Sequence, residues 1–196
     1  MAKKKGLSAL LTDAKKEEIK IAITGATIKD DLCNYSFDIL SGTGTGDNHA
    51  VKGSGLIDED LREAFNDLNV HPAAIDDSFK GMKAIGFDEM KLHERATLYM
   101  VDGFKITGSE EDEAIILLGS KHVSASGERM KLTTPRIPLN SMPSYKWAKQ
   151  LKKVADAVRE EVELYKGGKC TAPDPDETDP KQLNIESNES FEAAKV

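Results

Sequence analysis

The chain has 196 residues and a mass of 21.4 kDa, which suits one domain or two small ones. Its 27 Lys and Arg against 34 Asp and Glu give a formal net charge of -7, and 39% hydrophobic residues argue against a wholly disordered chain. No apolar run approaches the ~20 residues that span a bilayer, so we expect a cytoplasmic protein without a membrane segment.

The first 17 residues, with lysines at positions 3–5, are predicted to form an N-terminal basic or helical arm. An α+β core is expected to follow over residues 18–168. Cys33 and Cys170 are far apart and match no CxxC spacing, so neither a disulfide scaffold nor a thiolate zinc site is expected.

Three strands are predicted in the first half of the core, because apolar residues alternate there with polar ones. They cover residues 19–23, 33–39 and 48–57, the last after the Gly-rich turn 42–46. A helix then begins near Asp58, an acidic residue suited to capping a helix N-terminus. Its apolar side holds Leu61, Ala64, Phe65 and Leu68. Another short helical turn is expected at Pro72.

The second half repeats this order. Strands are predicted over residues 97–106, 113–118 and 129–137, and a long helix over 142–167. Its apolar stripe contains Trp147, Leu151, Val154, Val158 and Val162, and two glycines mark its end.

The repeated order indicates a duplication. A shift of 78 residues aligns Ile23 with Val101, Gly25 with Gly103, and Phe37 with Ile115, while shifts of 81 and about 84 align the third strands and the helices. We therefore expect an α+β fold of duplicated βββα units, halves 18–68 and 95–166, with antiparallel sheets packed against helices. Chance matching of one alternating pattern to another is the alternative.

Residues 169–196 are predicted to form a flexible, disordered acidic tail. From Thr171 to the last residue there are seven acids, two bases and three prolines. So little apolar surface cannot offset the entropy lost on ordering the segment. A tethered polyanion of this kind would compete with phosphates for a cationic groove.

No catalytic constellation is evident. The glycines at 42–46 are followed by a strand rather than by Gly-Lys-Ser/Thr, so a hairpin loop is favoured over a phosphate loop. The four histidines have no metal-ligand spacing and stand beside no nucleophile motif. We therefore expect no enzyme, no metal and no cofactor.

Cations and aromatic residues lie together on or near the predicted strands. This combination suits single-stranded nucleic acid, because cations follow the phosphates and each base stacks on a ring for about 1–3 kcal/mol. The alternative places the rings in the core and the cations on a solvated face; it is preferred for Phe37 and Tyr99 and left open for Tyr35 and Phe104. The candidate residues are Lys20, Tyr35, Lys52, Phe104, Lys105, Lys121, Arg129, Lys131 and Arg136.

A compact β-rich domain followed by an acidic C-terminal segment resembles prokaryotic and phage single-stranded-DNA-binding proteins. The repeated order of strands and helix resembles the Whirly/PUR-type nucleic-acid-binding architecture. The phrases Asn-Val-His-Pro-Ala-Ala-Ile-Asp-Asp at 69–77 and Ser-Tyr-Lys-Trp at 144–147 are similar to proteins of phages that infect gut Bacteroidetes.

The resemblance implies a non-enzymatic protein that binds single-stranded DNA in phage replication or recombination. Its partners would be the DNA, replication proteins that dock on the acidic tail, and further copies in a homo-oligomer. Two alternatives stay open: a phage structural or assembly protein, and an acidic inhibitor or adaptor that mimics nucleic acid.

Overall fold

The structure, a computed structural model, describes residues 20–40, 46–80, 85–109, 111–123, 126–139 and 145–171. The expected N-terminal arm and most of the expected tail lie outside these stretches. The strands are β1 (Lys20–Lys29), β2 (Leu32–Leu40), β3 (Gly46–Val51), β4 (Tyr99–Thr107), β5 (Ala114–Val123), β6 (Glu128–Thr133) and β7 (Ile137–Pro138). The helices are α1 (Glu59–Asn66), α2 (Val70–Ile75), α3 (Phe87–Lys91) and α4 (Ala148–Lys166), with a 3-10 turn, η2 (Ala96–Leu98).

All the strands of the described residues join one seven-stranded antiparallel sheet in the order β3-β2-β1-β4-β5-β6, with β7 paired to β5. The expected α+β class and antiparallel pairing are confirmed, and the strands form one sheet rather than several. The two halves of the chain meet where β1 pairs with β4, and Ala26 lies opposite Phe104 in this ladder.

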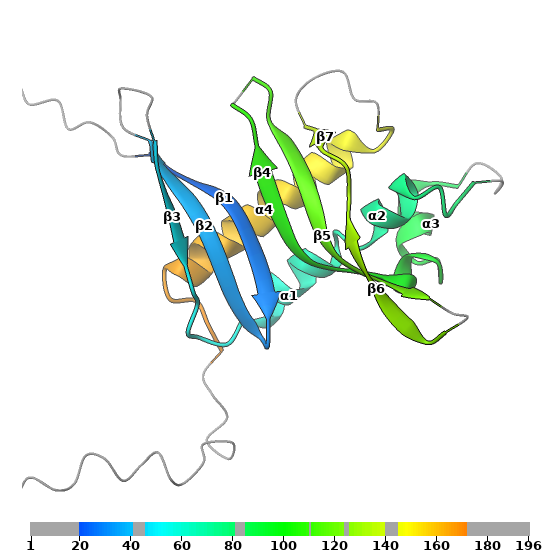
Figure 1. Cartoon of the computed structure of the whole chain (residues 1–196), viewed down its shortest axis with the longest axis horizontal. Coiled ribbons are helices and arrows are strands. Elements are labelled where there is room, and N and C mark those ends of the chain that lie inside the picture. The colour runs from blue at the N-terminus through cyan, green and yellow to red at the C-terminus, as the bar shows by residue number, and fades with distance from the viewer. Residues whose placement is uncertain are drawn as a thin grey trace, which may run out of the picture.

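Helices α1 and α4 cover the same face of the sheet (Figure 1). Helix α4 crosses β1 and β2, while α1 packs on β4 and on α4. The core between them is apolar, because the strands turn every second side chain toward the helices. It includes Ile23, Leu61, Phe65, Phe104, Ile115, Leu117, Leu151, Val158 and Val162. Within the described residues, Figure 1 shows no helix on the other face, which we call the open face.

The helix predicted from Asp58 begins there: its carboxylate accepts a hydrogen bond from the Leu61 N–H at 3.1 Å. This contact satisfies one of the N–H groups that a first turn leaves free. Helix α4 begins at Ala148, later than predicted, and ends at Lys166. None of the described helices is both long and apolar enough to cross a membrane.

Two predicted strands are shorter than expected. Strand β3 ends at Val51, and Gly53 beyond it passes so close to the Cys33 carbonyl that a Cβ there would overlap it. In the second half Pro135 cannot donate a ladder hydrogen bond. The expected strand 129–137 is therefore divided into β6 and the short β7, which pairs with β5.

Candidate nucleic-acid interface

A groove of about 850 Å³ runs over the open face. Strands β1 and β2 supply its floor with small polar side chains, because the residues between their core positions point this way. Thr24 and Ser36 are hydrogen-bonded to each other there at 3.0 Å, and Thr27 and Asn34 lie along the same two strands. The side chains of this floor thus offer hydroxyl and amide groups, while Tyr35 and Phe104, which also line the groove, turn their rings toward the helix side.

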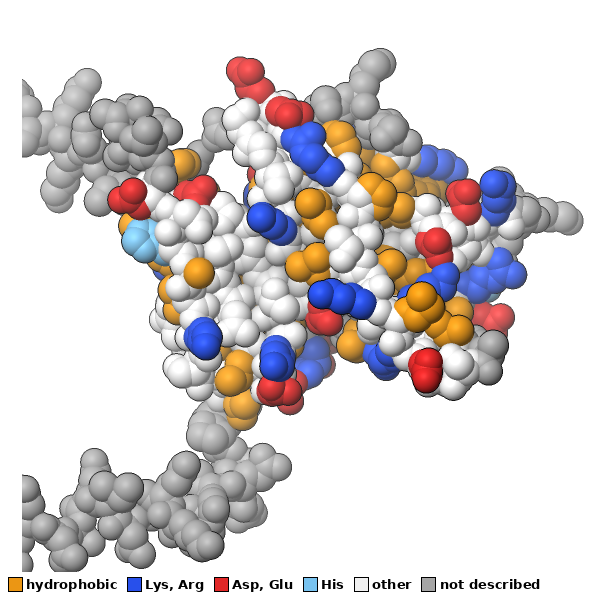
Figure 2. Space-filling view, viewed as in Figure 1, with side chains coloured by type: hydrophobic (Ala, Val, Ile, Leu, Met, Phe, Trp, Pro, Cys, Tyr) orange, Lys and Arg blue, Asp and Glu red, His pale blue; other side chains and the backbone are white. Residues whose placement is uncertain are grey.

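Cations flank this groove. Lys52, after β3, and Lys105, on β4, line it, and both side chains are exposed. Figure 2 views the molecule from the open face and shows Lys and Arg side chains spread over it.

Arg129 and Lys131 extend this positive surface over β6. The guanidinium Nη1 of Arg129 lies 3.4 Å from Ser120 Oγ on β5 and 3.3 Å from Met100 Sδ on β4. Lys131 pairs in register with Ser120, so it shares that face. Both side chains are exposed.

Arg136 is also exposed, next to the groove, where its Nε donates to Thr107 Oγ1 at 3.2 Å. Its Nη2 contacts Asp112 Oδ2 at 2.8 Å, so part of its charge is already neutralised. The groove carboxylate Asp38 accepts a hydrogen bond from Asn48 at 2.7 Å. The structure therefore places five of the predicted cations on or beside the open face: Lys52, Lys105, Arg129, Lys131 and Arg136.

The two aromatic candidates do not lie on the open face. Phe104 is 2% exposed and packs against Phe65 with ring centroids 6.0 Å apart. Its predicted stacking on a base is wrong, because a base cannot reach it. Tyr35 turns toward α4 and packs edge-on against Tyr165, with the ring centroids 6.3 Å apart. Desolvation by burial raises the pKa of the Tyr35 hydroxyl.

Lys121 also lies on the helix side of the sheet. Its ammonium donates to Asp76 and stands 5.0 Å from the centre of the Tyr99 ring. The hydrogen bond to Asp76 raises the pKa of Lys121. The prediction that Lys121 joins the other cations is therefore wrong. The Lys20 side chain is outside the part of the chain that the structure describes.

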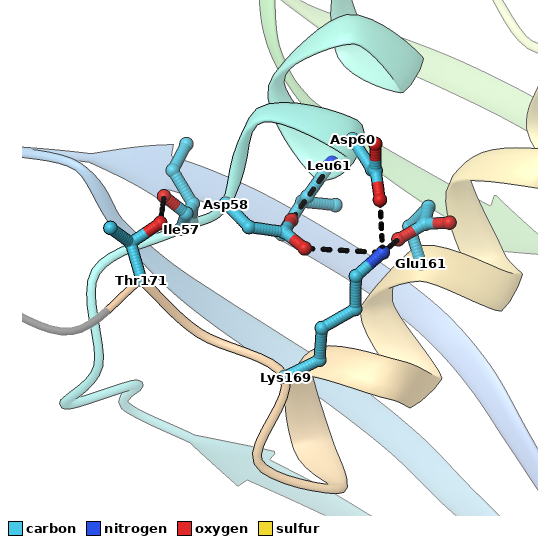
Figure 3. A network of polar contacts seen from close by, with 7 residues as sticks. All are labelled: Ile57, Asp58, Asp60, Leu61, Glu161, Lys169 and Thr171. Carbon is cyan, nitrogen blue, oxygen red and sulfur yellow. Dashed lines mark hydrogen bonds and ion pairs between the residues drawn. The ribbon is translucent and has the colours of Figure 1, made fainter.

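One cluster of acids has the spacing of a cation site. Asp58, Asp60 and Glu161 each place a carboxylate oxygen within 4.8 Å of the others. The ammonium of Lys169 lies among them, 2.6 Å from Asp60, 2.7 Å from Glu161 and 3.1 Å from Asp58 (Figure 3). Hydrogen bonds to Asp60 and Glu161 raise the pKa of Lys169. A protein cation thus supplies the charge that a metal ion would, and the cluster ties the end of α4 to α1.

No protein-family model matches the chain, and no match is found among curated proteins or solved structures. One fold can host many functions, so the chemistry of the site is the better guide to what this chain binds. The open face, with its groove and five cations, is the feature with the clearest chemistry.

Proposed function

We propose that this protein binds single-stranded nucleic acid, and DNA in the first place, on the open face of its sheet and without catalysing a reaction. One observation carries the proposal. Five exposed cations from the end of β3, from β4 and β6, and from the segment before β7 lie on the sheet face that no described helix covers, spread from its β3 edge to its β6 edge. In a chain of net charge -7 five cations on one face favour a polyanionic ligand.

The groove suggests how the strand is held. Lys52 and Lys105 would contact phosphates on its two sides, and Thr24, Thr27 and Asn34 would donate or accept hydrogen bonds at sugars and base edges. Phosphate contacts dominate such binding and make it strongly salt-dependent. Because the predicted rings are on the helix side, base stacking on Phe104 is no part of this proposal.

A titration of fluorescent oligo-dT over a salt series tests this function. Replacing Lys105 and Lys131 by Ala should weaken binding and flatten the plot of log K against log salt by about 0.7 for each phosphate that the variant no longer neutralises. The matched control replaces Lys149 and Lys153, two exposed lysines of α4, and makes the same change in net charge. Equal weakening in both variants, or no binding of oligo-dT at low salt, would contradict the proposal.

We also propose that the two halves of the chain are copies of one βββα unit. Each first strand has a register irregularity, between Ile23 and Gly25 in β1 and between Val101 and Gly103 in β4. These irregularities are 78 residues apart, as are Ala26 and Phe104, the pair at the centre of the β1·β4 ladder. A twofold relation about that pair would account for both coincidences.

The pairing register favours larger offsets for the later strands than the sequence alignment does. Gly25 pairs with Ser36, and Gly103 pairs with Leu118, so the second strands correspond at 82 rather than 78 residues. Ser36 pairs with Ala50, and Leu118 pairs with Thr133, which gives 83 rather than 81 for the third strands. The connections between strands are thus where the second copy would have grown longer.

A pair of glycine variants tests the duplication. A Cβ on Gly25 would lie 3.0 Å from the Phe104 carbonyl oxygen, and a Cβ on Gly103 would lie 3.0 Å from the Ala26 carbonyl oxygen. Because the two sites are equivalent in the proposed repeat, Gly25→Ala and Gly103→Ala should lower the free energy of unfolding by the same amount, about 1 kcal/mol. Urea denaturation measures both, and a clearly unequal pair would count against the twofold relation.

A further inference from the structure

A second, smaller pocket adjoins the groove where β3 ends. It measures about 320 Å³ and lies between the chain after β3 and the C-terminal end of α4. Tyr35, Val51 and Lys52 line both cavities, so the pocket continues the groove around the edge of the sheet. Lys166, from the end of α4, and Cys170, after it, also line the pocket.

Glycines and a buried hydroxyl shape this pocket. A Cβ on Gly53 would overlap the Tyr165 hydroxyl, so only glycine lets the chain pass at this point. The Tyr165 hydroxyl donates to the Gly55 carbonyl and accepts from the Cys33 N–H at 3.4 Å. These contacts fix the loop after β3 to the end of α4, so the pocket has firm walls.

The charge of the lining selects an anion. Lys52 and Lys166 stand among the lining residues, and no Asp or Glu does. The Lys166 ammonium lies 4.7 Å from the centre of the Phe37 ring of β2, a cation–π contact that restrains its side chain. A volume of about 320 Å³ is at the low end of small-molecule pockets, roughly 300–1,000 Å³, and has no room for a base pair.

We propose that this pocket takes one nucleotide of the strand bound on the open face, with its base beside Tyr35 and its flanking phosphates at Lys52 and Lys166. This inference rests on the proposed function and adds a path to it. The strand leaves the groove past Lys52 and turns around the β3 edge. Only an unpaired strand can make that turn, so the pocket would also discriminate against duplex DNA.

The native Cys170 thiol tests the pocket without any mutation. Cys170 is exposed and lines it, while Cys33 is fully buried, and burial raises the pKa of the Cys33 thiol to about 12. Because the thiolate is the reactive form, iodoacetamide should label Cys170 selectively. With oligo-dT at about ten times its Kd, the labelling rate of Cys170 should fall about tenfold, since only free protein reacts.

A second cysteine position provides the control. In Cys170→Ser/Glu94→Cys the single exposed thiol lies between α3 and η2, which packs near β5 rather than near the β3 edge, and oligo-dT should leave its labelling rate unchanged. In addition, Lys166→Ala should weaken oligo-dT binding and reduce the salt slope by about 0.7.

The outcomes separate the two proposals. Failure of oligo-dT to bind at low salt would overturn the proposed function. Binding that leaves Cys170 labelling unchanged, or protection of the Glu94→Cys thiol to the same degree, would overturn the nucleotide pocket while the open-face function stands.

Discussion

Phe104 and Lys105 are neighbours in β4, and they lie on opposite faces of the sheet. Phe104 is 2% exposed and packs against Phe65 of α1, while Lys105 is exposed and lines the groove. One strand thus serves the stability of the fold on one side and the proposed binding on the other. The face on which a residue lies, rather than its position along the strand, therefore decides what its replacement changes.

A pair of alanine variants tests most strongly whether the two faces of β4 differ in their effect on stability. Phe104→Ala should lower the free energy of unfolding by about 3–5 kcal/mol, because it leaves a cavity in the core. Lys105→Ala should change it by less than about 0.5 kcal/mol and should weaken oligo-dT binding. Urea denaturation followed by circular dichroism measures the first quantity. A similar loss of stability in both variants would remove the distinction between the faces.

A second test concerns a titratable group on the helix side. His71 of α2 is fully buried, and its Nδ1 is 2.9 Å from the Tyr145 hydroxyl. Burial first, and the charge of Lys91 second, lower the pKa of His71 to about 3. The unfolded chain binds the proton near pH 6.5, so stability is lost as the pH falls from 6.5 toward 3.

This linkage amounts to about 2 kcal/mol at pH 5. His71→Gln keeps a partner for Tyr145 and does not titrate, so its loss of unfolding free energy between pH 7 and pH 5 should be smaller by that amount. Denaturant titrations at the two pH values measure the difference. Equal losses in the variant and in the parent protein would show that His71 is not the acid-sensitive group.

The smallest expected effect concerns access to the open face. Residues 172–196 contain seven acids and two bases, a net of -5, so the rest of the chain has -7 + 5 = -2. Removing them should leave folding intact and tighten oligo-dT binding severalfold at low salt, and the gain should fade as salt screens the charges. Fluorescence anisotropy over a salt series measures it. Unchanged affinity at every salt concentration would mean that this segment does not compete for the open face.

Most elements could be predicted from the sequence, because alternation and helix capping are local signals. Asp58 caps α1 as expected, and alternation predicts β2 almost to its bounds but only the first part of β1, which continues to Lys29. The face on which Lys121 lies can also be predicted from the sequence. Lys121 continues the odd-numbered core positions Ile115 and Leu117 of β5 and so shares their face.

The face of Phe104 was harder to predict. In β4 the buried positions change from odd to even, from Tyr99 and Val101 to Phe104, at the irregularity before Gly103. A glycine in a strand permits such a bulge and does not reveal on which side the following residues emerge. The pocket after β3 was also beyond the sequence, because it joins the end of α4 to a loop more than a hundred residues earlier.

The chain after α4 returns to the start of α1, so these two parts of the folded body depend on each other. Residues 169 and 171 belong to the folded body, beyond the boundary expected at 168: the Thr171 N–H donates to the Leu56 carbonyl at 3.0 Å, and Lys169 joins Asp58 and Asp60 at the start of α1. During synthesis the contacts of α1 are therefore complete only after residues more than a hundred positions later have been made. Until residue 169 has been made, the carboxylates of Asp58 and Asp60 lack the ion pairs that they form with Lys169 in the folded chain.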